Sequence, residues 1–338
     1  MYLSRMERKR ELRLKNKKRL KKYILLSLFF IVATLLIGFY YEKIGEYDDL
    51  KEYSSIGEMV DINPHKINVF SKGEGNVTVV FTGGLNEPSS YADFYPLYNE
   101  ISKYSKIAVY DRPGHGWSEV TDAPRDIDSI VDEMHNALIK SGQKPPYILV
   151  GHSLASLSVI RFAQLHKDEV SGIVLIDGGS PEYYSKNSLA FSNSTVLNYK
   201  LLKSLGIARL ALYHTSYSSK ITSGQNDLKL LPNELKNLYT VMTLKTMYNK
   251  NIVDEGNLAS LNAQKVLDNG KLGDIPLRIL TAENSVLSIP EWENSQIDLK
   301  NWSTNSKQMV VKNSRHPIHQ FEPDIINNEI IELIKNHL

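Results

Sequence analysis

Cysteine is missing from the sequence altogether, although the chain has 338 residues. The protein therefore has no disulfide bond, no thiolate nucleophile and no cysteine-ligated zinc site. An excess of positive charge is also absent from most of the chain. Residues 1–22 hold eleven Lys or Arg and two Glu, and the formal net charge of the remaining residues is −7. Phosphate contacts need a basic face, so this acidic body excludes nucleic acid as the expected partner.

Internal repeats and low-complexity tracts are absent as well. Hydrophobic residues make up 42% of the chain. This composition is ordinary for a globular protein of one large core. Disorder, collagen and coiled coil are excluded as the main structure.

One long hydrophobic run is present near the N-terminus. Residues 23–41, YILLSLFFIVATLLIGFYY, carry no charge and would span roughly 28 Å as a helix, close to the hydrocarbon thickness of a bilayer. The preceding residues are strongly basic and the following ones mostly acidic, which places the N-terminus in the cytoplasm and the body outside. We predict a single-pass cell-membrane protein with a basic cytoplasmic tail at 1–22, a transmembrane helix at 23–41 and a linker at 42–56.

A cleaved signal peptide is the main alternative to this anchor. Its apolar region would be shorter and would end at a small-residue cleavage site. Here the run ends in GFYYEK, which offers no such site, so we favour an uncleaved signal-anchor.

Short apolar runs alternate with helix-like stretches from residue 57 onward. This alternation predicts a parallel sheet covered by helices on both faces. Residues 178–272 show helical periodicity without a clear strand, so we predict a helical cap inserted between two parts of one core, 57–177 and 273–338. The expected strands are 66–70, 77–81, 106–110, 147–152, 172–176, 276–281 and 308–312.

The sequence VGHSLAS at 150–156 places Ser153 between an apolar strand and a helix. A serine on such a tight turn projects its hydroxyl above the sheet, as in the nucleophile elbow G-x-S-x-G. Gly151 and Ala155 leave room for the turn, although Ala155 stands where the pattern has its second glycine. Ser153 is therefore the candidate nucleophile.

Two backbone N–H groups are candidates for an oxyanion hole. The N–H of Leu154 begins the helix that follows the elbow, where helix N-termini stabilise negative charge. A second donor is expected from the loop TGGLNEPSS at 82–90, whose two glycines let the backbone approach a substrate. Leu85 is the preferred donor in this loop and Gly84 the next candidate.

A histidine follows the last predicted strand, in NSRHPIHQFEP at 313–323. His316 is the candidate general base, which would accept the Ser153 proton on attack and return it to the leaving group. His319 is its rival. The HPIH spacing also suggests a metal pair, but no third ligand is evident, so we predict no metal site.

The acid that orients the histidine has two candidates between the serine and His316 in the chain. Asp177 ends the strand GIVLI, whereas Glu283 follows the strand PLRILT. An aspartate is expected two residues beyond Glu283, but Ser285 stands there. We favour Asp177 and keep Glu283 as the alternative acid.

Together these motifs resemble the α/β-hydrolase superfamily, specifically its lid-bearing serine esterase and lipase-like branch. The resemblance covers residues 57–338 and is carried, in the family's order, by VVFTGGLNEPSSY, YDRPGHGWSE, VGHSLAS, VLIDGGSPE and NSRHPIHQFEPDII. It implies an α/β fold with a mostly parallel eight-stranded sheet, helices on both faces, an inserted helical cap and no cofactor. It also implies a Ser-acid-His triad and backbone oxyanion donors.

The function expected from this resemblance is hydrolysis of a small or medium carboxylic ester by a membrane-anchored serine hydrolase, through an acyl-enzyme at Ser153. An aminopeptidase of the proline iminopeptidase type is an alternative, although such an enzyme usually gathers acidic residues in its cap. A ligand-binding or signalling protein that keeps the fold without turnover is the alternative from another class.

Overall fold

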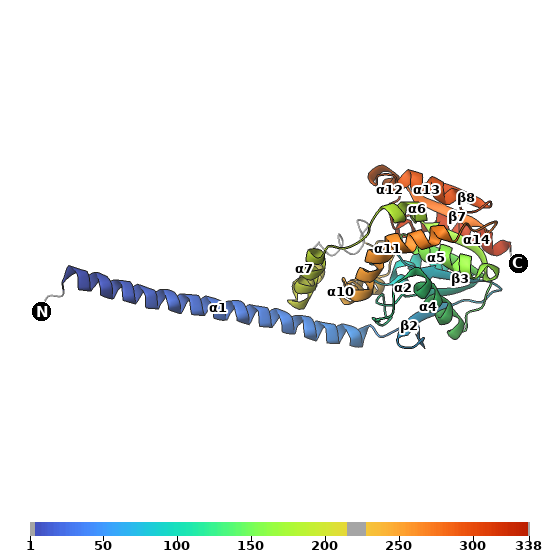
Figure 1. Ribbon diagram of the computed structural model, residues 1–338. Helices are drawn as coiled ribbons and strands as arrows, with labels where there is room; N and C mark the ends of the chain where they lie inside the picture. Colours follow the sequence, from blue (N-terminus) through green and yellow to red (C-terminus); the bar gives the residue numbers. More distant parts are fainter. Residues whose placement is uncertain (1–3, 215–227, 337–338) are drawn as a thin grey trace.

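The computed structural model describes residues 4–214 and 228–336, which form one long helix attached to an α/β body (Figure 1). The helix α1 spans Arg5–Glu52, 48 residues, and is about 72 Å long at 1.5 Å per residue. It begins with a capping box in which Ser4 and Glu7 bind each other's backbone N–H groups. Most of its length extends away from the body, with the N-terminus at the far end.

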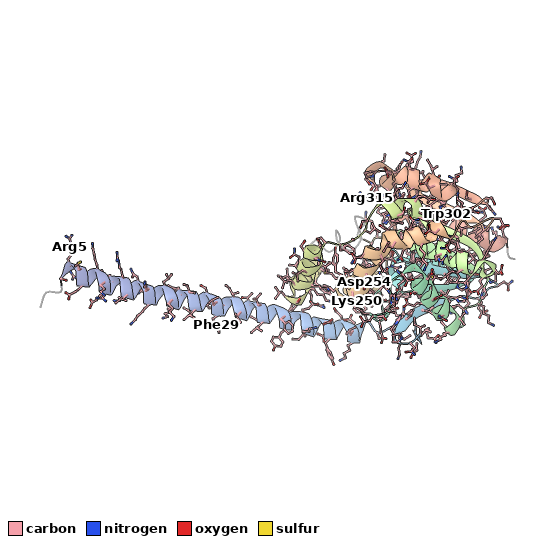
Figure 2. All side chains as sticks on the ribbon, in the orientation of Figure 1. Arg5, Phe29, Lys250, Asp254, Trp302 and Arg315 are labelled. Carbon is pink, nitrogen blue, oxygen red and sulfur yellow. The ribbon has the colours of Figure 1, made fainter. Side chains whose placement is uncertain are left out.

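Helix α1 is long and apolar enough to cross a membrane, and none of its most apolar window is buried by the described residues. Figure 2 shows Arg5 and Phe29 on the part of the helix that is remote from the body. A core helix would bury this stretch, so the exposed surface is that of a candidate membrane span.

The same helix runs through most of residues 42–56, the segment expected to be a linker. Its polar turns are helical as far as Glu52 because they have partners on two sides. Lys43 pairs with Glu46 one turn later, and Glu42 and Asp49 bind Arg209 of the body. A tertiary contact of this kind leaves no local pattern in the sequence.

Eight strands form one sheet in the order β1-β2-β4-β3-β5-β6-β7-β8. Strand β2 pairs antiparallel with both of its neighbours, β1 and β4, and the other pairs are parallel, which confirms the predicted mostly parallel sheet. The strands are β1 (Glu58–Asp61), β2 (Lys66–Lys72), β3 (Thr78–Thr82), β4 (Lys106–Tyr110), β5 (Tyr147–His152), β6 (Val170–Ile176), β7 (Leu277–Ala282) and β8 (Ser306–Val311).

Both faces of the sheet are buried, which explains why its strands read as unbroken apolar runs. Alternate residues of a strand point to opposite faces, and β3 contributes Val80 to one core cluster and Val79 and Phe81 to the other. The first cluster includes α4 (Ile127–Lys140) and α5 (Ala155–Leu165). The second includes α3 (Tyr95–Ile101) and α14 (Pro323–Lys335), which follow the short helix α2 (Ser90–Asp93) and the 3₁₀ turn η2 (Ile318–Gln320), respectively.

Helices alone are described between β6 and β7, at the place of the predicted cap. They are α6 (Pro181–Lys186), α7 (Asn193–Ser204), α8 (Ile207–His214), α10 (Asn233–Thr246) and α11 (Lys250–Asp268). Residues 215–227 of the predicted cap lie outside the described residues. After β7 the chain forms α12 (Glu283–Ser288) and α13 (Trp292–Lys300) before β8.

Candidate active site

Ser153 lies on the turn between β5 and α5, with a backbone φ of 54°. This left-handed conformation is costly for a residue with a side chain, and such strain gathers at functional sites. The Ser153 N–H donates to the carbonyl of Ile176 on the neighbouring strand at 3.0 Å. The elbow predicted from the sequence is therefore present, and the serine is half-buried above the sheet.

The glycine loop after β3 lies directly against this serine. A Cβ added to Gly84 would stand 2.8 Å from the Cβ of Ser153, so the approach requires glycine. The Arg112 guanidinium donates to the Gly84 carbonyl at 2.9 Å. Because the peptide is trans, the N–H of Leu85 points the opposite way, away from Arg112.

The hydrogen bonds of this loop distinguish its two candidate oxyanion donors. The Gly84 N–H donates to the Glu87 carboxyl at 3.0 Å. Among the described residues, the N–H groups of Leu85 and Leu154 have no hydrogen-bond partner. These two N–H groups are therefore available to a substrate oxygen, whereas the Gly84 N–H is already engaged.

His316 and Asp177 meet at the carboxyl ends of their strands. The His316 Nδ1 lies 2.7 Å from the Asp177 Oδ2, although 139 residues separate them in the chain. The Asp177 side chain is completely buried, whereas 40% of the His316 side chain is exposed. A buried carboxylate on Nδ1 leaves the other ring nitrogen free for proton transfer.

Three further donors converge on the Asp177 carboxylate. The Ala282 N–H and the Trp292 indole N–H each lie 2.9 Å from Oδ1, and the Ser285 hydroxyl donates to Oδ2. Ser285 is the residue that stands where an aspartate was expected, and it binds the acid from β6. Sequence analysis did not identify Trp292, because its approach depends on how α13 packs over β7.

The two rival residues lie elsewhere. The Glu283 carboxylate accepts the Asn313 N–H at 2.9 Å. His319 is fully buried on η2, where its Nε2 contacts the Asp93 carboxyl. The structure thus brings together His316 and Asp177 of the predicted set, and it places Glu283 and His319 in other contacts.

A tyrosine to which sequence analysis assigned no role lies beside Ser153. The Tyr184 hydroxyl, on α6, accepts from the Gly179 N–H at 3.4 Å and lies near the Ser153 side chain. Tyr184 is buried, and burial raises its pKa. Its hydroxyl therefore stays neutral and forms one wall of the site.

A buried acid-imidazole chain connects the glycine loop to the backbone of His316. The Nε2 of His152 lies 3.2 Å from the His316 carbonyl, and its Nδ1 lies 3.0 Å from Glu87. Burial lowers the pKa of His152 to about 4 and raises the pKa of Glu87 to about 7. A carbonyl only accepts, so Nε2 carries the proton of a neutral imidazole and Glu87 donates to Nδ1.

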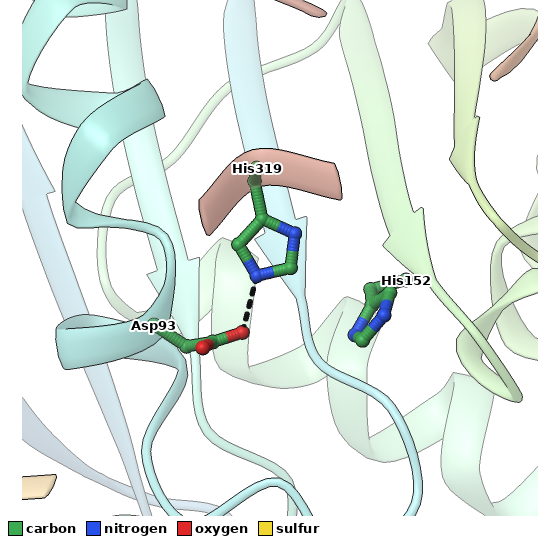
Figure 3. Close-up of side chains that lie close together, drawn as sticks. All are labelled: Asp93, His152 and His319. Carbon is green, nitrogen blue, oxygen red and sulfur yellow. Dashed lines mark hydrogen bonds and ion pairs between the residues drawn. The ribbon is translucent and has the colours of Figure 1, made fainter. Parts of the chain in front are cut away.

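A second buried pair packs beside this chain. Figure 3 shows the Asp93 carboxyl bound to His319, with the ring of His152 next to it. The ligand atoms of these three residues lie within 4.8 Å of one another, but Asp93 already binds His319 directly and accepts from Gln320. Burial raises the pKa of Asp93 to about 7 and lowers that of His319 to about 3. Between about pH 4 and pH 7, the three side chains are therefore neutral and packed together.

Replacing Glu87 with glutamine is expected to weaken the pH dependence of stability. The folded-state pKa of Glu87 is about 7 against an ordinary 4.5, so the folded protein keeps a proton that the unfolded chain releases. The contribution of Glu87 to the free energy of unfolding is then greatest below pH 4.5 and decreases as the pH rises toward 7. The glutamine amide cannot ionise, so the melting temperature of this variant should fall less between pH 5 and pH 8 than that of the wild type.

Thermal unfolding of the detergent-solubilised protein at the two pH values measures this difference. Glu58→Gln, at an exposed position on β1, is the matched control and should keep the wild-type difference. A Glu87→Gln protein with the full wild-type difference would show that Glu87 is ionised in the fold.

Comparisons with known proteins agree with this architecture. The chain is 29% identical to the uncharacterized protein YbdG of Bacillus subtilis, over 82% of this chain and 86% of that protein. It is 32% identical to the 2-(acetamidomethylene)succinate hydrolase of Mesorhizobium japonicum, over 38% of this chain and 45% of that enzyme. A bromoperoxidase from Bacillus anthracis superposes with a TM-score of 0.60 at 17% identity, covering 82% of this chain and 99% of that one.

The family described as alpha/beta hydrolase fold matches residues 77–323, which contain six of the eight strands, the elbow and His316. The bromoperoxidase structure has the same fold, and the similarity to YbdG extends over most of the chain. The chain therefore belongs to the alpha/beta hydrolase fold family.

Proposed function

We propose that this protein is a serine hydrolase that cleaves a carboxylic ester through an acyl-enzyme, with Ser153, His316 and Asp177 as its triad. The contact that carries the proposal is the 2.7 Å hydrogen bond between His316 and the buried Asp177, next to a serine held at a strained elbow. This pairing supports Asp177 over Glu283 as the acid.

The geometry supports a two-step reaction. Asp177 holds the Nδ1 proton of His316, so Nε2 accepts the hydroxyl proton as Ser153 attacks the ester carbonyl. The N–H groups of Leu85 and Leu154 stabilise the oxyanion of the tetrahedral intermediate. His316 then protonates the departing alcohol, and a water molecule activated by the same nitrogen releases the acid and restores Ser153.

Ester cleavage is favoured over aminopeptidase activity by the pairing of two adjacent acids on α11. A free amine needs an unpaired carboxylate near the nucleophile. The buried acid of α11, Glu255, is instead held by Arg112 at 3.1 Å, and its neighbour Asp254 pairs with Lys250 at the surface. The related Mesorhizobium enzyme is itself named a hydrolase.

The same proposal places the enzyme at a membrane. Helix α1 would span the bilayer through residues 23–41, with the basic residues before them on the cytoplasmic side and the body on the other. The uncovered apolar surface of α1 supports this assignment.

Fluorophosphonate labelling of the full chain in detergent tests the proposed nucleophile. We expect one modified residue, Ser153, located by mass spectrometry, and no labelling after Ser153→Ala. Ser158→Ala is the matched control: this serine is buried on α5 and donates only to the Ala155 carbonyl, so labelling should persist.

A folded protein that reacts nowhere would contradict the hydrolase proposal and favour the ligand-binding alternative. Reaction at another serine would retain a hydrolase but remove Ser153 from its centre. Circular dichroism of each variant establishes that the protein compared is folded.

A further inference from the structure

Two helices between β6 and β7 expose an unusual amount of apolar surface. Within Asn193–Ser204, helix α7 has no buried side chain. Several apolar residues of α7 and α8 keep between 37% and 67% of their surface exposed. They are Leu197, Leu201, Leu202, Ile207 and Leu210. We call this group the α7–α8 face.

The corner between these helices lies against the apolar part of α1. A Cβ at Gly38 would stand 2.2 Å from the Leu205 carbonyl, and one at Gly206 would stand 2.6 Å from the Gly38 carbonyl. Gly38 lies inside the uncharged run 23–41, three residues before its end. At 1.5 Å per residue, the corner is therefore about 4–5 Å inside the outer limit of the predicted span.

A buried ion-pair cluster fixes α8 along α1 at this level. Arg209 binds Glu42 at 2.9 Å and Asp49 at 2.7 Å, and the Tyr213 hydroxyl lies 3.2 Å from Asp49. Helix α8 therefore runs alongside α1 in the same direction: Gly206 lies beside Gly38, and Tyr213 lies beside Asp49. Figure 1 shows α7 next to the second half of α1, apart from the sheet. The α7–α8 face cannot leave the membrane level while this cluster holds.

A partly open hollow lies between α7 and the glycine loop. Its wall includes Tyr199 of α7, and also Asn86 and Pro88, which follow the oxyanion donor Leu85. Tyr248 stacks on Tyr199 with ring centroids 4.5 Å apart. This hollow, lined by aromatic and polar side chains, gives an acyl chain space between α7 and the glycine loop.

We propose that the α7–α8 face inserts into the outer interface of the membrane that α1 spans, and that the substrate is an amphiphilic ester drawn from that membrane. Apolar helical surface at the depth of the interface binds in its plane. The occupant is the lipid itself because the face continues directly from the span at Gly38. The substrate class rests on the proposed hydrolase function, whereas the insertion does not.

Insertion is tested by single-cysteine labelling, since the chain has no native cysteine. Leu201→Cys, Phe29→Cys and Leu287→Cys are each labelled with an environment-sensitive nitrobenzoxadiazole dye. The full chain is then placed in phosphatidylcholine vesicles whose acyl chains carry nitroxide quenchers. Leu287 is 79% exposed on α12 and serves as the water-side control; Phe29 is the span control.

We expect quenching at positions 29 and 201 and none at 287. Quenching at 29 without quenching at 201 would overturn the insertion. Absence of quenching at 29 as well would remove the span and the proposal with it.

The substrate class is tested by a second comparison in the same vesicles. Leu201→Glu combined with Leu210→Glu should lower hydrolysis of membrane-embedded p-nitrophenyl palmitate about tenfold, because the charges oppose insertion. Hydrolysis of water-soluble p-nitrophenyl acetate should not change, and Leu287→Glu should change neither rate.

Equal losses on both esters, or no loss on the palmitate, would overturn the membrane-derived substrate. A wild-type protein inactive on both esters would contradict the hydrolase function and the substrate class together. The quenching result would still decide the insertion independently.

Discussion

Replacing Asp177 with asparagine is expected to lower kcat on a short ester by about 10⁴-fold. The carboxylate holds the proton on Nδ1 of His316 across a 2.7 Å hydrogen bond. An amide that presents its NH₂ group to Nδ1 selects the opposite tautomer, which leaves no lone pair on Nε2 for the Ser153 proton. The serine would then lose its base while the fold stays intact. Initial rates with p-nitrophenyl acetate measure the effect.

The matched control is Glu283→Gln, which removes the other candidate acid. Its carboxylate accepts one backbone N–H, from Asn313, and makes no contact with the imidazole. The rate should stay close to that of the wild type. If Glu283→Gln were inactive and Asp177→Asn active, the acid would belong after β7 and the triad proposed here would be wrong.

Arg112→Ala is expected to lower the free energy of unfolding by about 3–5 kcal/mol, the range for breaking one side of a buried ion pair. The Arg112 and Glu255 side chains are 5% and 3% exposed and lie 3.1 Å apart. Although burial opposes ionisation of Glu255, the guanidinium lowers its pKa. Removing Arg112 would strand this carboxylate and would also release the carbonyls of Gly83 and Gly84.

Urea unfolding in detergent measures the loss. Lys250→Ala breaks an exposed pair with Asp254 and should leave the free energy of unfolding nearly unchanged. The double variant Arg112→Met with Glu255→Leu should recover much of the loss, because it leaves no unpaired charge. A double variant as unstable as Arg112→Ala would mean that the hydrogen bonds to the glycine loop, rather than the ion pair, stabilise this region.

The parts of the fold that depend on local pattern could be predicted from the sequence. The parallel sheet followed from unbroken apolar runs such as VTVVF, because both faces of that strand are buried. The elbow at Ser153 followed from small residues between a strand and a helix. Strand β1, four residues with one buried side chain, was too short to give such a pattern.

The surroundings of the site depend on contacts between distant segments, which local pattern does not encode. Asp177 and Glu283 both follow strands, and the local sequence does not show that Asp177 contacts Ser285, Trp292 and His316. The acid-imidazole chain of Glu87 and His152 joins residues 65 positions apart. Likewise, the helical state of residues 42–52 depends on Arg209, far along the chain.

The continuity of α1 into the body sets how this enzyme would search for substrate. The eleven helical residues from Glu42 to Glu52 form a rigid segment about 15 Å long, and the ion pairs of Arg209 with Glu42 and Asp49 hold it against the body. A body attached to the membrane through such a rigid helix keeps one height and one tilt above the bilayer. Under the function proposed above, encounters would occur by lateral diffusion in two dimensions, and the enzyme would act on molecules of its own membrane rather than on those of a facing surface.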